Sequence, residues 1–326
     1  MRVTPIVRAA FVRLLIDEAP YVGTQIELAG KGSIMHGLNS TIVKNLLLFV
    51  PPHDEQNKIL AFLDRETAKI DALVAEQQRL MALLKEKRQA VISHAVTRGL
   101  NPHAPMKPSG IEWLGDVPEH WGAVPIKHLG RLKGGAGFPH EKQGIEGEEL
   151  SFHKVNALAQ ADSDGFLADS ENTIDRATAK ELGAFVFPAG SIVFAKVGAA
   201  LLLGRIRLLS QNACLDNNMM GLVVRQDEFA VSFVRYAMNL VRFDLIANPG
   251  AVPSLNEGQI GDFRLAMPPI PEQTQIAAFL DRETTKIDAL VAEAQRAIDL
   301  LQERRTALIS AAVTGQIDVR GVAQIL

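Results

Sequence analysis

Several short stretches in the middle of the sequence carry side chains that can hydrogen-bond to the edges of nucleic-acid bases. Arginine pairs with the O6 and N7 atoms of guanine, asparagine pairs with the N6 and N7 atoms of adenine, and lysine contacts phosphate as readily as a base. The candidates are Ser151, His153, Lys154, Asn156, Lys196, Arg205, Arg207 and Asn217. Their chemistry predicts DNA binding, and an ordinary solvated surface role is the alternative for each residue taken singly.

The charge balance limits how such binding could work. Residues 111–267 contain 14 Lys and Arg against 19 Asp and Glu, and the whole chain has a formal net charge of -3. DNA affinity would therefore have to come from a local patch of basic side chains and not from the field of the whole domain.

No residue pattern indicates catalysis or a bound cofactor. Residues 134–137 (GGAG) lack the lysine and Ser/Thr of a phosphate-binding loop, so we expect a turn there. The eight histidines include no HExxH arrangement. Residues 216–218 (DNN) could be ligands, but a turn with local hydrogen bonds is the simpler interpretation. We therefore expect no catalytic residue, no metal site and no cofactor bound by the chain itself.

An internal repeat indicates which elements position these residues. Residues 51–97 recur at residues 268–314, an offset of 268 − 51 = 217, and about two-thirds of the positions are identical. The chain therefore contains two copies of one element separated by a different segment. Such pseudo-symmetry suits a two-sided partner, either two identical subunits or the two halves of a bipartite DNA site.

Apolar residues in each copy are spaced alternately three and four positions apart, as in the seam of a coiled coil. The seam runs through Leu60, Leu63, Thr67, Ile70, Val74, Gln77, Met81, Leu84, Arg88, Val91 and Ala95, and it is repeated from Ala277 to Ala312. Each copy is predicted to be one helix spanning roughly 60 Å at ~1.5 Å per residue. We expect the two helices to pair antiparallel, and a simple dimerisation rod is the alternative.

Composition sets the outer limits. The chain has 326 residues, of which 47% are hydrophobic, so it can form two or more globular domains. No apolar run reaches the ~18 residues of a membrane span, and no signal-peptide pattern opens the sequence. The single cysteine, Cys214, excludes an internal disulfide and fits the reducing cytoplasm, where we expect the protein to act.

The segment between the two predicted helices differs in character. Residues 99–110 contain three prolines and two glycines and are predicted to be a linker. Beyond them, apolar runs at residues 183–187 and 191–195 are bounded by proline and glycine and predict short strands. Residues 230–247 have helical spacing. The fold class predicted is α+β, a globular domain plus two long helices forming an antiparallel coiled coil.

The order of motifs resembles the specificity (S) subunit of type I restriction-modification systems. The motifs are IEWLGDVPEHW at residues 111–121, GSIVFAKVGA at 190–199, PGAVPSLN at 249–256 and MPPIPEQTQIAAFLDRETTKID from residue 267. In that family two target recognition domains, each reading one half of a bipartite DNA sequence, alternate with two long helices. The resemblance implies a noncatalytic subunit with three kinds of partner: double-stranded DNA, methyltransferase (M) subunits that bind S-adenosylmethionine, and restriction/translocase (R) subunits that use ATP and Mg²⁺.

The resemblance implies the following domains: residues 1–50 as the end of a first target recognition domain, 51–98 as the first helix, 99–110 as the linker, 111–267 as the second target recognition domain, 268–314 as the second helix and 315–326 as a tail. Residues 37–50 align with residues 254–267, and Phe11-Val12-Arg13 aligns with Phe233-Val234-Arg235 if a five-residue gap is allowed. The first domain therefore looks truncated, and we expect residues 1–50 to be poorly ordered or packed against another element.

The departure at the front leaves three alternatives open. In the first, the surviving domain directs DNA recognition. In the second, the chain is an assembly-only or interfering scaffold without productive recognition. In the third, a second copy, or a fragment encoded upstream, supplies the missing front.

Overall fold

The computed structural model describes residues 7–30, 40–162, 164–167 and 169–319. The chain divides into two compact units. Unit 1 comprises residues 1–86 and 287–326, and unit 2 comprises residues 87–286. Two long helices, α4 (His53–Arg98) and α10 (Ile270–Val313), each contribute to both units. Their bounds agree with the predicted helices to within two residues.

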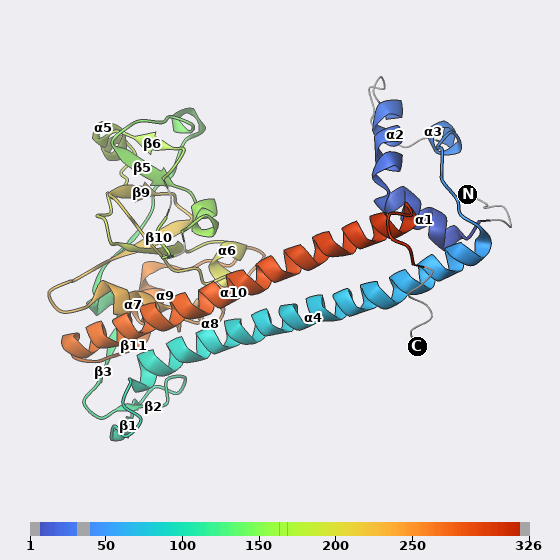
Figure 1. Ribbon diagram of the computed structural model, residues 1–326. Coiled ribbons are helices and arrows are strands. Elements are labelled where there is room, and N and C mark those ends of the chain that lie inside the picture. The colour runs from blue at the N-terminus through green and yellow to red at the C-terminus, as the bar shows by residue number, and fades with distance from the viewer. Residues whose placement is uncertain (1–6, 31–39, 163, 168, 320–326) are drawn as a thin grey trace. The chain divides into compact units, whose positions relative to one another are not determined.

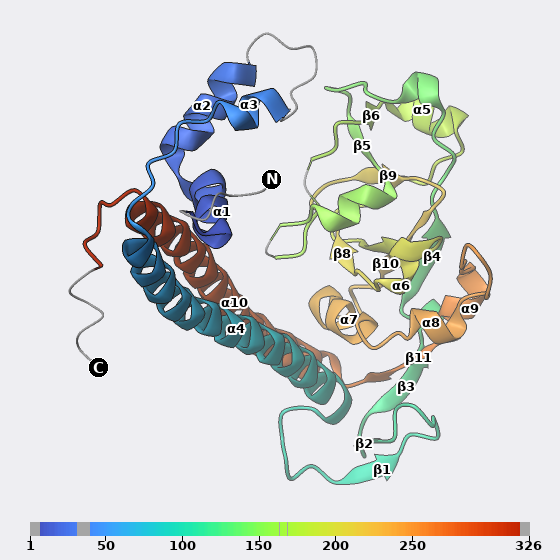
Figure 2. The ribbon, with the colours of Figure 1, turned by 90° about the vertical axis from the view of Figure 1, so that its right-hand side faces the viewer.

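Within unit 1, α4 and α10 run side by side in opposite directions (Figures 1 and 2). Ile59 and Leu63 of α4 share an apolar cluster with Ile309 of α10. Further along α4, the Asp71 carboxylate accepts a hydrogen bond of 2.9 Å from Nε of Arg305, which precedes Ile309. Rising numbers on one helix therefore meet falling numbers on the other, and the antiparallel pairing predicted from the seam is confirmed here.

Seam residues are buried on both helices. Leu63, Ile70, Ile287 and Ile298 are each no more than 6% exposed. Thr284, a polar seam residue, donates its hydroxyl hydrogen to the Leu280 carbonyl at 2.7 Å, which satisfies the group within its own helix.

Unit 1 begins with three helices, α1 (Ala9–Glu18), α2 (Pro20–Gly30) and α3 (Ser40–Lys44). Phe11 and Leu15 of α1 are completely buried, and they belong to the apolar cluster formed by the ends of α4 and α10. The second of the two outcomes expected for this front segment is therefore observed, because it packs against the long helices. Residues 37–39 of the aligned segment lie outside the described residues.

The joint between the front segment and α4 has a counterpart in unit 2. The buried Gln273 accepts a hydrogen bond from the Ala230 amide at 2.8 Å and donates one to the Pro268 carbonyl at 2.9 Å. Gln56, 217 positions earlier, bonds in the same way to the Arg8 amide (2.8 Å) and the Pro51 carbonyl (2.9 Å). Arg8 and Ala230 are the N-caps of α1 and α7 (Val231–Met238). This equivalence confirms the five-residue gap in the sequence alignment.

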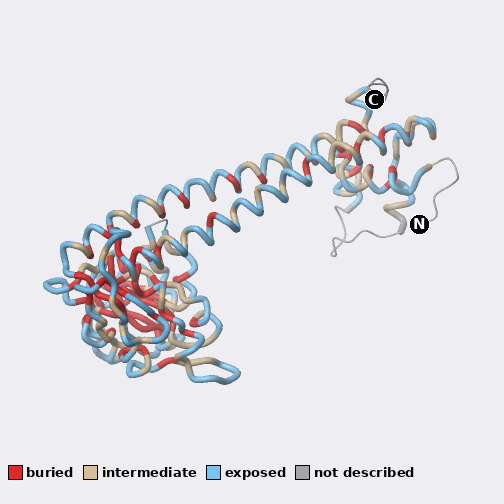
Figure 3. The backbone as a smooth tube through the Cα atoms, turned by 90° about the horizontal axis from the view of Figure 1, so that it is seen from below, coloured by how far each residue is buried: buried red, intermediate tan, exposed pale blue. Residues whose placement is uncertain are grey.

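Unit 2 carries four small sheets and the largest apolar core (Figure 3). Its strands are β1 (Met106–Pro108), β2 (Asp116–Pro118), β3 (Gly122–Pro125), β4 (Gly130–Gly134), β5 (Leu150–His153), β6 (Thr173–Ile174), β7 (Ile192–Ala195), β8 (Arg207–Leu208), β9 (Ala213–Leu215), β10 (Met219–Val224) and β11 (Arg264–Met267). The sheets have the orders β4-β10-β7-β8, β6-β5-β9, β11-β3 and β1-β2. All pairs are antiparallel except β5 with β9. The predicted α+β class with two long helices is confirmed.

The remaining helices of unit 2 are short: α5 (Arg176–Glu181), α6 (Ala199–Leu202), α7, α8 (Phe243–Ile246) and α9 (Glu257–Gly261). The helix predicted over residues 230–247 is therefore wrong in its middle, since the chain leaves helix between α7 and α8. The predicted strand at residues 183–187 is also wrong, because only Phe187 makes an isolated bridge, to Ala213. The segment predicted as a linker contains β1, which pairs with β2.

Two glycines in unit 2 allow backbone segments to approach closely. A Cβ at Gly130 would lie 2.0 Å from the Val223 carbonyl oxygen, and a Cβ at Gly135 would lie 2.0 Å from the Asp216 carbonyl oxygen. Residues 134–137 are thus only in part the turn that the sequence predicted. Gly134 ends β4. Gly135 must be glycine because the backbone of Asp216 leaves no room for a Cβ atom.

Candidate nucleic-acid interface

Strand pairing brings three of the predicted residues to one place. The parallel pair of β5 and β9 matches His153 with Leu215, so the residues that follow the two strands lie side by side, and the Asp216 amide donates to the His153 carbonyl at 2.9 Å. The Lys196 amide, just beyond β7, donates to the Asn218 carbonyl at 2.8 Å. We call Lys154, Lys196 and Asn217 the loop cluster.

Residues 216–218 form the turn expected from the sequence. The Asn218 amide donates to a carboxylate oxygen of Asp216 at 3.0 Å, which holds the turn in shape. Burial raises the pKa of the Asp216 carboxyl, and the hydrogen bonds from Asn218 oppose that rise. Asn217 is exposed at the tip, so its amide is available to a partner.

The lysines of the loop cluster are positioned by neighbouring side chains and backbone. Nζ of Lys154 donates to Oε1 of Gln143 at 2.9 Å. Nζ of Lys196 lies 2.7 Å from the place where Gly134 would carry a Cβ, so a larger residue there would displace the ammonium group. Asn156 is exposed in the short 3-10 helix Val155–Ala159, directly after Lys154.

Two of the predicted residues are buried. Ser151 is 4% exposed, and its hydroxyl oxygen accepts a hydrogen bond from Gln211 at 3.0 Å. His153 is 3% exposed, and burial lowers the pKa of its imidazole to about 4. Both lie on β5, the middle strand of its sheet, whose four residues are all buried. We therefore withdraw Ser151 and His153 as base contacts, since neither side chain reaches the surface.

Arg205 and Arg207 belong to a second group. Arg207 lies on β8, an edge strand that pairs with β7, whereas Arg205 precedes the strand. Burial lowers the pKa of the Arg207 guanidinium, and the positive charges of Arg205, Arg235 and Arg88 lower it further. Within the described residues, its buried Nε has no hydrogen-bond partner. We call Arg88, Arg205, Arg207 and Arg235 the arginine cluster.

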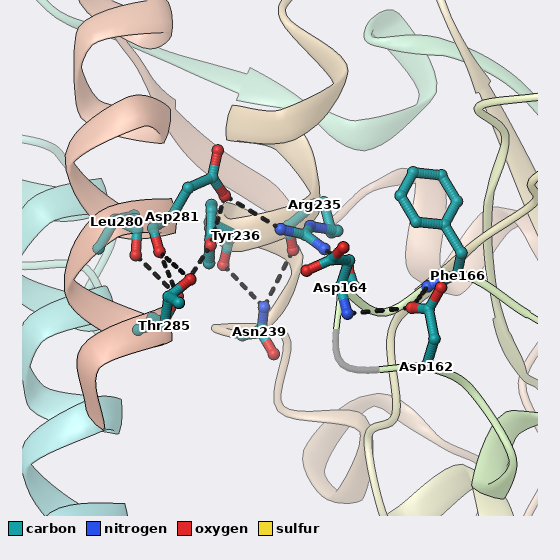
Figure 4. Close-up of polar contacts among 10 residues, drawn as sticks. Asp162, Asp164, Phe166, Arg235, Tyr236, Asn239, Leu280, Asp281 and Thr285 are labelled. Atoms are coloured by element: carbon teal, nitrogen blue, oxygen red, sulfur yellow. Dashed lines mark hydrogen bonds and ion pairs between the residues drawn. The ribbon is translucent and has the colours of Figure 1, made fainter. Parts of the chain in front are cut away.

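The arginine cluster is fixed by the contacts of Arg235 (Figure 4). One guanidinium nitrogen donates to the Asp164 carbonyl, and the other lies 3.3 Å from the Asp281 carboxylate. The Tyr236 hydroxyl donates to the same carboxylate at 2.7 Å. Asp281 therefore ties α7 to α10, while Arg235 reaches the loop before Phe166, which bridges to Leu208 beside Arg207.

That loop is held by Asp162, whose carboxylate accepts hydrogen bonds from the amides of Asp164 (3.0 Å) and Phe166 (2.8 Å). These four arginines concentrate positive charge in a domain that is acidic overall. Arg235 and Arg88 were not among the residues predicted from the sequence. The signal for Arg235 was present, since it is the arginine of the repeated Phe-Val-Arg triplet.

The described residues contain neither a metal-ligand cluster nor a helix that could span a membrane. No group of three or more His, Cys, Asp and Glu side chains there is arranged to hold a metal ion. No helix in the same residues is both long and apolar enough to cross a membrane.

Comparison with known proteins gives this fold its class. A family model described as the type I restriction modification DNA specificity domain matches residues 118–298. The type I restriction enzyme MjaVIII specificity subunit of Methanocaldococcus jannaschii is 20% identical over 303 residues, which are 90% of this chain and 67% of that protein. The putative type I restriction enzyme MjaX specificity subunit of the same organism is 19% identical over 296 residues, 87% of this chain and 62% of the relative.

Solved structures agree on the fold. A structure from a study of complex assembly and conformational transition of the type I restriction-modification system has a TM-score of 0.74 and 16% identity, covering 96% of this chain and 72% of that one. The crystal structure of the HsdS subunit from Thermoanaerobacter tengcongensis has a TM-score of 0.51 and 15% identity, covering 96% and 71%.

These likenesses define the class as type I specificity subunits, the class that the motif order resembled. The family match spans more than half of the 326 residues. The chain belongs to the type I restriction-modification DNA specificity family. It spans about two-thirds of the length of the curated relatives that it matches.

Proposed function

We propose that this chain is a noncatalytic subunit that reads one half of a bipartite DNA sequence with residues 111–267. The observation that carries the proposal is the family match, which begins at residue 118 and covers nearly all of that segment. The arginine cluster supplies charge for phosphates, and Asn217, Lys154, Lys196 and Asn156 supply hydrogen-bonding groups at exposed or half-buried positions.

The long helices have a separate part in the proposal. They would scaffold two methyltransferase (M) subunits, and restriction/translocase (R) subunits would join that complex. S-adenosylmethionine, ATP and Mg²⁺ would belong to those partners, and this chain would bind no cofactor. The antiparallel pairing of α4 and α10 in unit 1 supports a scaffold, because two repeated helices present repeated surfaces to two copies of one partner.

The decisive experiment maps methylated adenines across a genome after coexpression with the cognate methyltransferase. A consistent motif is expected, and replacing residues 111–267 with the corresponding domain of another family member should change it. An unchanged motif after that replacement would refute half-site reading. A copurifying complex that methylates nothing would favour the assembly-only scaffold.

Single residues can be tested by DNA affinity at several salt concentrations. Asn217→Ala should cost about 1–3 kcal/mol for one base pair's recognition and leave the salt dependence unchanged. Arg205→Ala should weaken binding to all DNA sequences alike and reduce the slope of log affinity against log salt concentration by about 1. Arg176→Ala is the matched control, because Arg176 is exposed on α5 and already paired with Glu149 at 2.6 Å. Equal losses for Arg205→Ala and Arg176→Ala would remove the arginine cluster from the interface.

A further inference from the structure

In unit 2, residues 113–125, which include β3, make three neighbouring contacts. Strand β3 pairs with β11. The Trp113 ring stacks on Phe263 with centroids 4.7 Å apart. The buried Trp121 donates its indole hydrogen to Glu272 at 3.1 Å, and its ring lies 3.2 Å from the Cβ position of Gly99, the glycine that follows α4.

All three receiving groups have counterparts in unit 1. An offset of 217 relates Phe263 to Leu46, β11 to residues 47–50 and Glu272 to Glu55. The buried glutamine joint described above makes the same hydrogen bonds in both units, so this sequence offset is also a structural one.

The strand pairing in unit 2 shows which backbone groups should face a partner. The Ile126 amide donates to the Phe263 carbonyl at 2.9 Å, in register with the β3 and β11 pairing. In an antiparallel pair, every second residue directs both its N–H and its C=O at the neighbour. Those residues of β11 are Leu265 and Met267. The counterparts of Phe263, Leu265 and Met267 in unit 1 are Leu46, Leu48 and Val50, in that order.

In unit 1 this edge has no partner among the described residues. The backbone groups of Leu46, Leu48 and Val50 make no hydrogen bond there. The intervening residues are satisfied on the other side. Leu47 exchanges two hydrogen bonds with the Gln25 side chain (2.9 and 3.1 Å), and the Phe49 amide donates to the Tyr21 hydroxyl at 3.1 Å. The alternation is that of a strand with one edge open.

The positions in unit 1 that correspond to the contacts of Trp113 and Trp121 are also not filled by described residues. Leu46 lines an apolar recess of about 300 Å³ with Leu28 and Ala29, where the counterpart of Trp113 would lie. The Glu55 side chain makes no hydrogen bond or ion pair within the described residues. Gly315, which follows α10 with the same φ of 74° as Gly99, has no described atom within 4 Å of its Cβ position.

We propose that this surface binds a second polypeptide that carries the opening of a target recognition domain: a tryptophan, a second tryptophan eight residues later, and then a strand. The strand pairs with residues 46–50, the first ring fills the recess beside Leu46, and the second indole donates to Glu55. Unit 2 shows that these chemical groups fit such a surface. Phe49 is 76% exposed, whereas its counterpart Ala266 in unit 2 is 1% exposed, which marks the surface as incomplete.

A second copy of this chain does not supply that segment. Its residues 111–126 are already used within its own unit 2, where Trp121 is 1% exposed. The proposed occupant is a different chain with the same motif. This inference goes beyond the proposed function, because it concerns unit 1 and needs no DNA.

The test uses the full chain and a fluorescent peptide with the sequence of residues 111–129. Saturable binding with one peptide per chain is expected, together with slowed hydrogen exchange at the Leu48 amide and unchanged exchange at Leu47 and Phe49. The peptide carrying Trp121→Ala should bind at least about tenfold more weakly, since it loses a hydrogen bond to a charged group. No binding at millimolar peptide would overturn the proposal.

Variants of the chain locate the site. Glu55→Ala should weaken peptide binding about tenfold or more, and Leu48→Pro, which removes the central open amide, should abolish it. Asp54→Ala is the matched control, since Asp54 is also an acid in the first turn of α4 but has a proline as its repeat counterpart. Equal effects of Glu55→Ala and Asp54→Ala would refute the indole contact. A dimer of the chain that dissociates in Leu48→Pro would show that a second copy is the occupant instead, against the proposal. The methylation motif is measured separately, so failure here leaves the proposed function standing.

Discussion

Gln273 is the residue whose replacement best tests how the globular domain of unit 2 is joined to α10. It is 1% exposed and holds the N-cap of α7 and the carbonyl of Pro268 with its two amide atoms. Gln273→Leu keeps the size of the side chain and removes both hydrogen bonds. The Ala230 amide and the Pro268 carbonyl would then be left without partners.

The magnitude follows from burial. A buried polar group without a partner costs about 1–3 kcal/mol. The bond to Pro268 is fully buried, and the bond from Ala230 is partly buried, so the first should cost more than the second. The sum should be about 3 kcal/mol. With a urea m-value of about 2.5 kcal/mol/M, the midpoint of unfolding would fall by roughly 1 M.

The assay is urea unfolding followed by tryptophan fluorescence. Both tryptophans of the chain, Trp113 and Trp121, lie in unit 2, so the signal reports that unit alone. Gln302→Leu is the control, because Gln302 is exposed on the same helix and the change leaves no buried group unpaired. A midpoint for Gln273→Leu within about 0.2 M of the control would refute the structural role given to the buried amide.

Three other predictions concern a buried histidine, a glycine and an ion pair. Because burial lowers the pKa of His153 to about 4 from an ordinary 6.5, the unfolded chain takes up a proton first as the pH falls. The free energy of unfolding of unit 2 should therefore fall by about 2 kcal/mol between pH 7 and 5, and this fall should be absent in His153→Gln. Urea midpoints that fall by the same amount in both proteins would contradict this. Gly135→Ala should prevent folding of unit 2, because the new Cβ would meet a backbone carbonyl oxygen at 2.0 Å, whereas Gly137→Ala, with open space around it, should fold with a circular dichroism spectrum like that of the wild type. A double-mutant cycle on Asp71 and Arg305, whose side chains are 56% and 38% exposed, should give less than about 1 kcal/mol of coupling, and a larger value that persists in 1 M salt would contradict the solvent screening expected there.

The long helices could be predicted from the sequence because their pattern is local. Seam residues such as Leu63 and Ile287 recur at fixed spacing, and burial on that spacing needs only a partner helix. The same pattern could not identify Ile92 and Ile276, which are completely buried although they lie beside the seam. These two residues face the globular core of unit 2, and the helical period alone does not reveal where a second layer packs.

The candidate site was harder to predict because its members are brought together by strand pairing. Lys154 and Lys196 are 42 positions apart and meet only because β5 pairs with β9 and the chain beyond β7 bonds to the turn after β9. Ser151 and His153 were selected because their side chains can hydrogen-bond to bases. Both lie on β5, whose four residues are all buried, and side-chain chemistry alone does not reveal burial.

The repeated joint explains how residues 7–30 can be ordered without the core of a complete domain. In unit 2, Phe233 of α7 packs into a core that also contains residues of α10, and the equivalent Phe11 of α1 meets Ile59 and Ile309 on the long helices. The part of the domain nearest to the helices thus buries its apolar side chains against them and needs no sheet to do so. The segment that in unit 2 depends on a strand partner is the one left open in unit 1. In unit 1, therefore, the exposed strand edge begins where packing against the long helices ends.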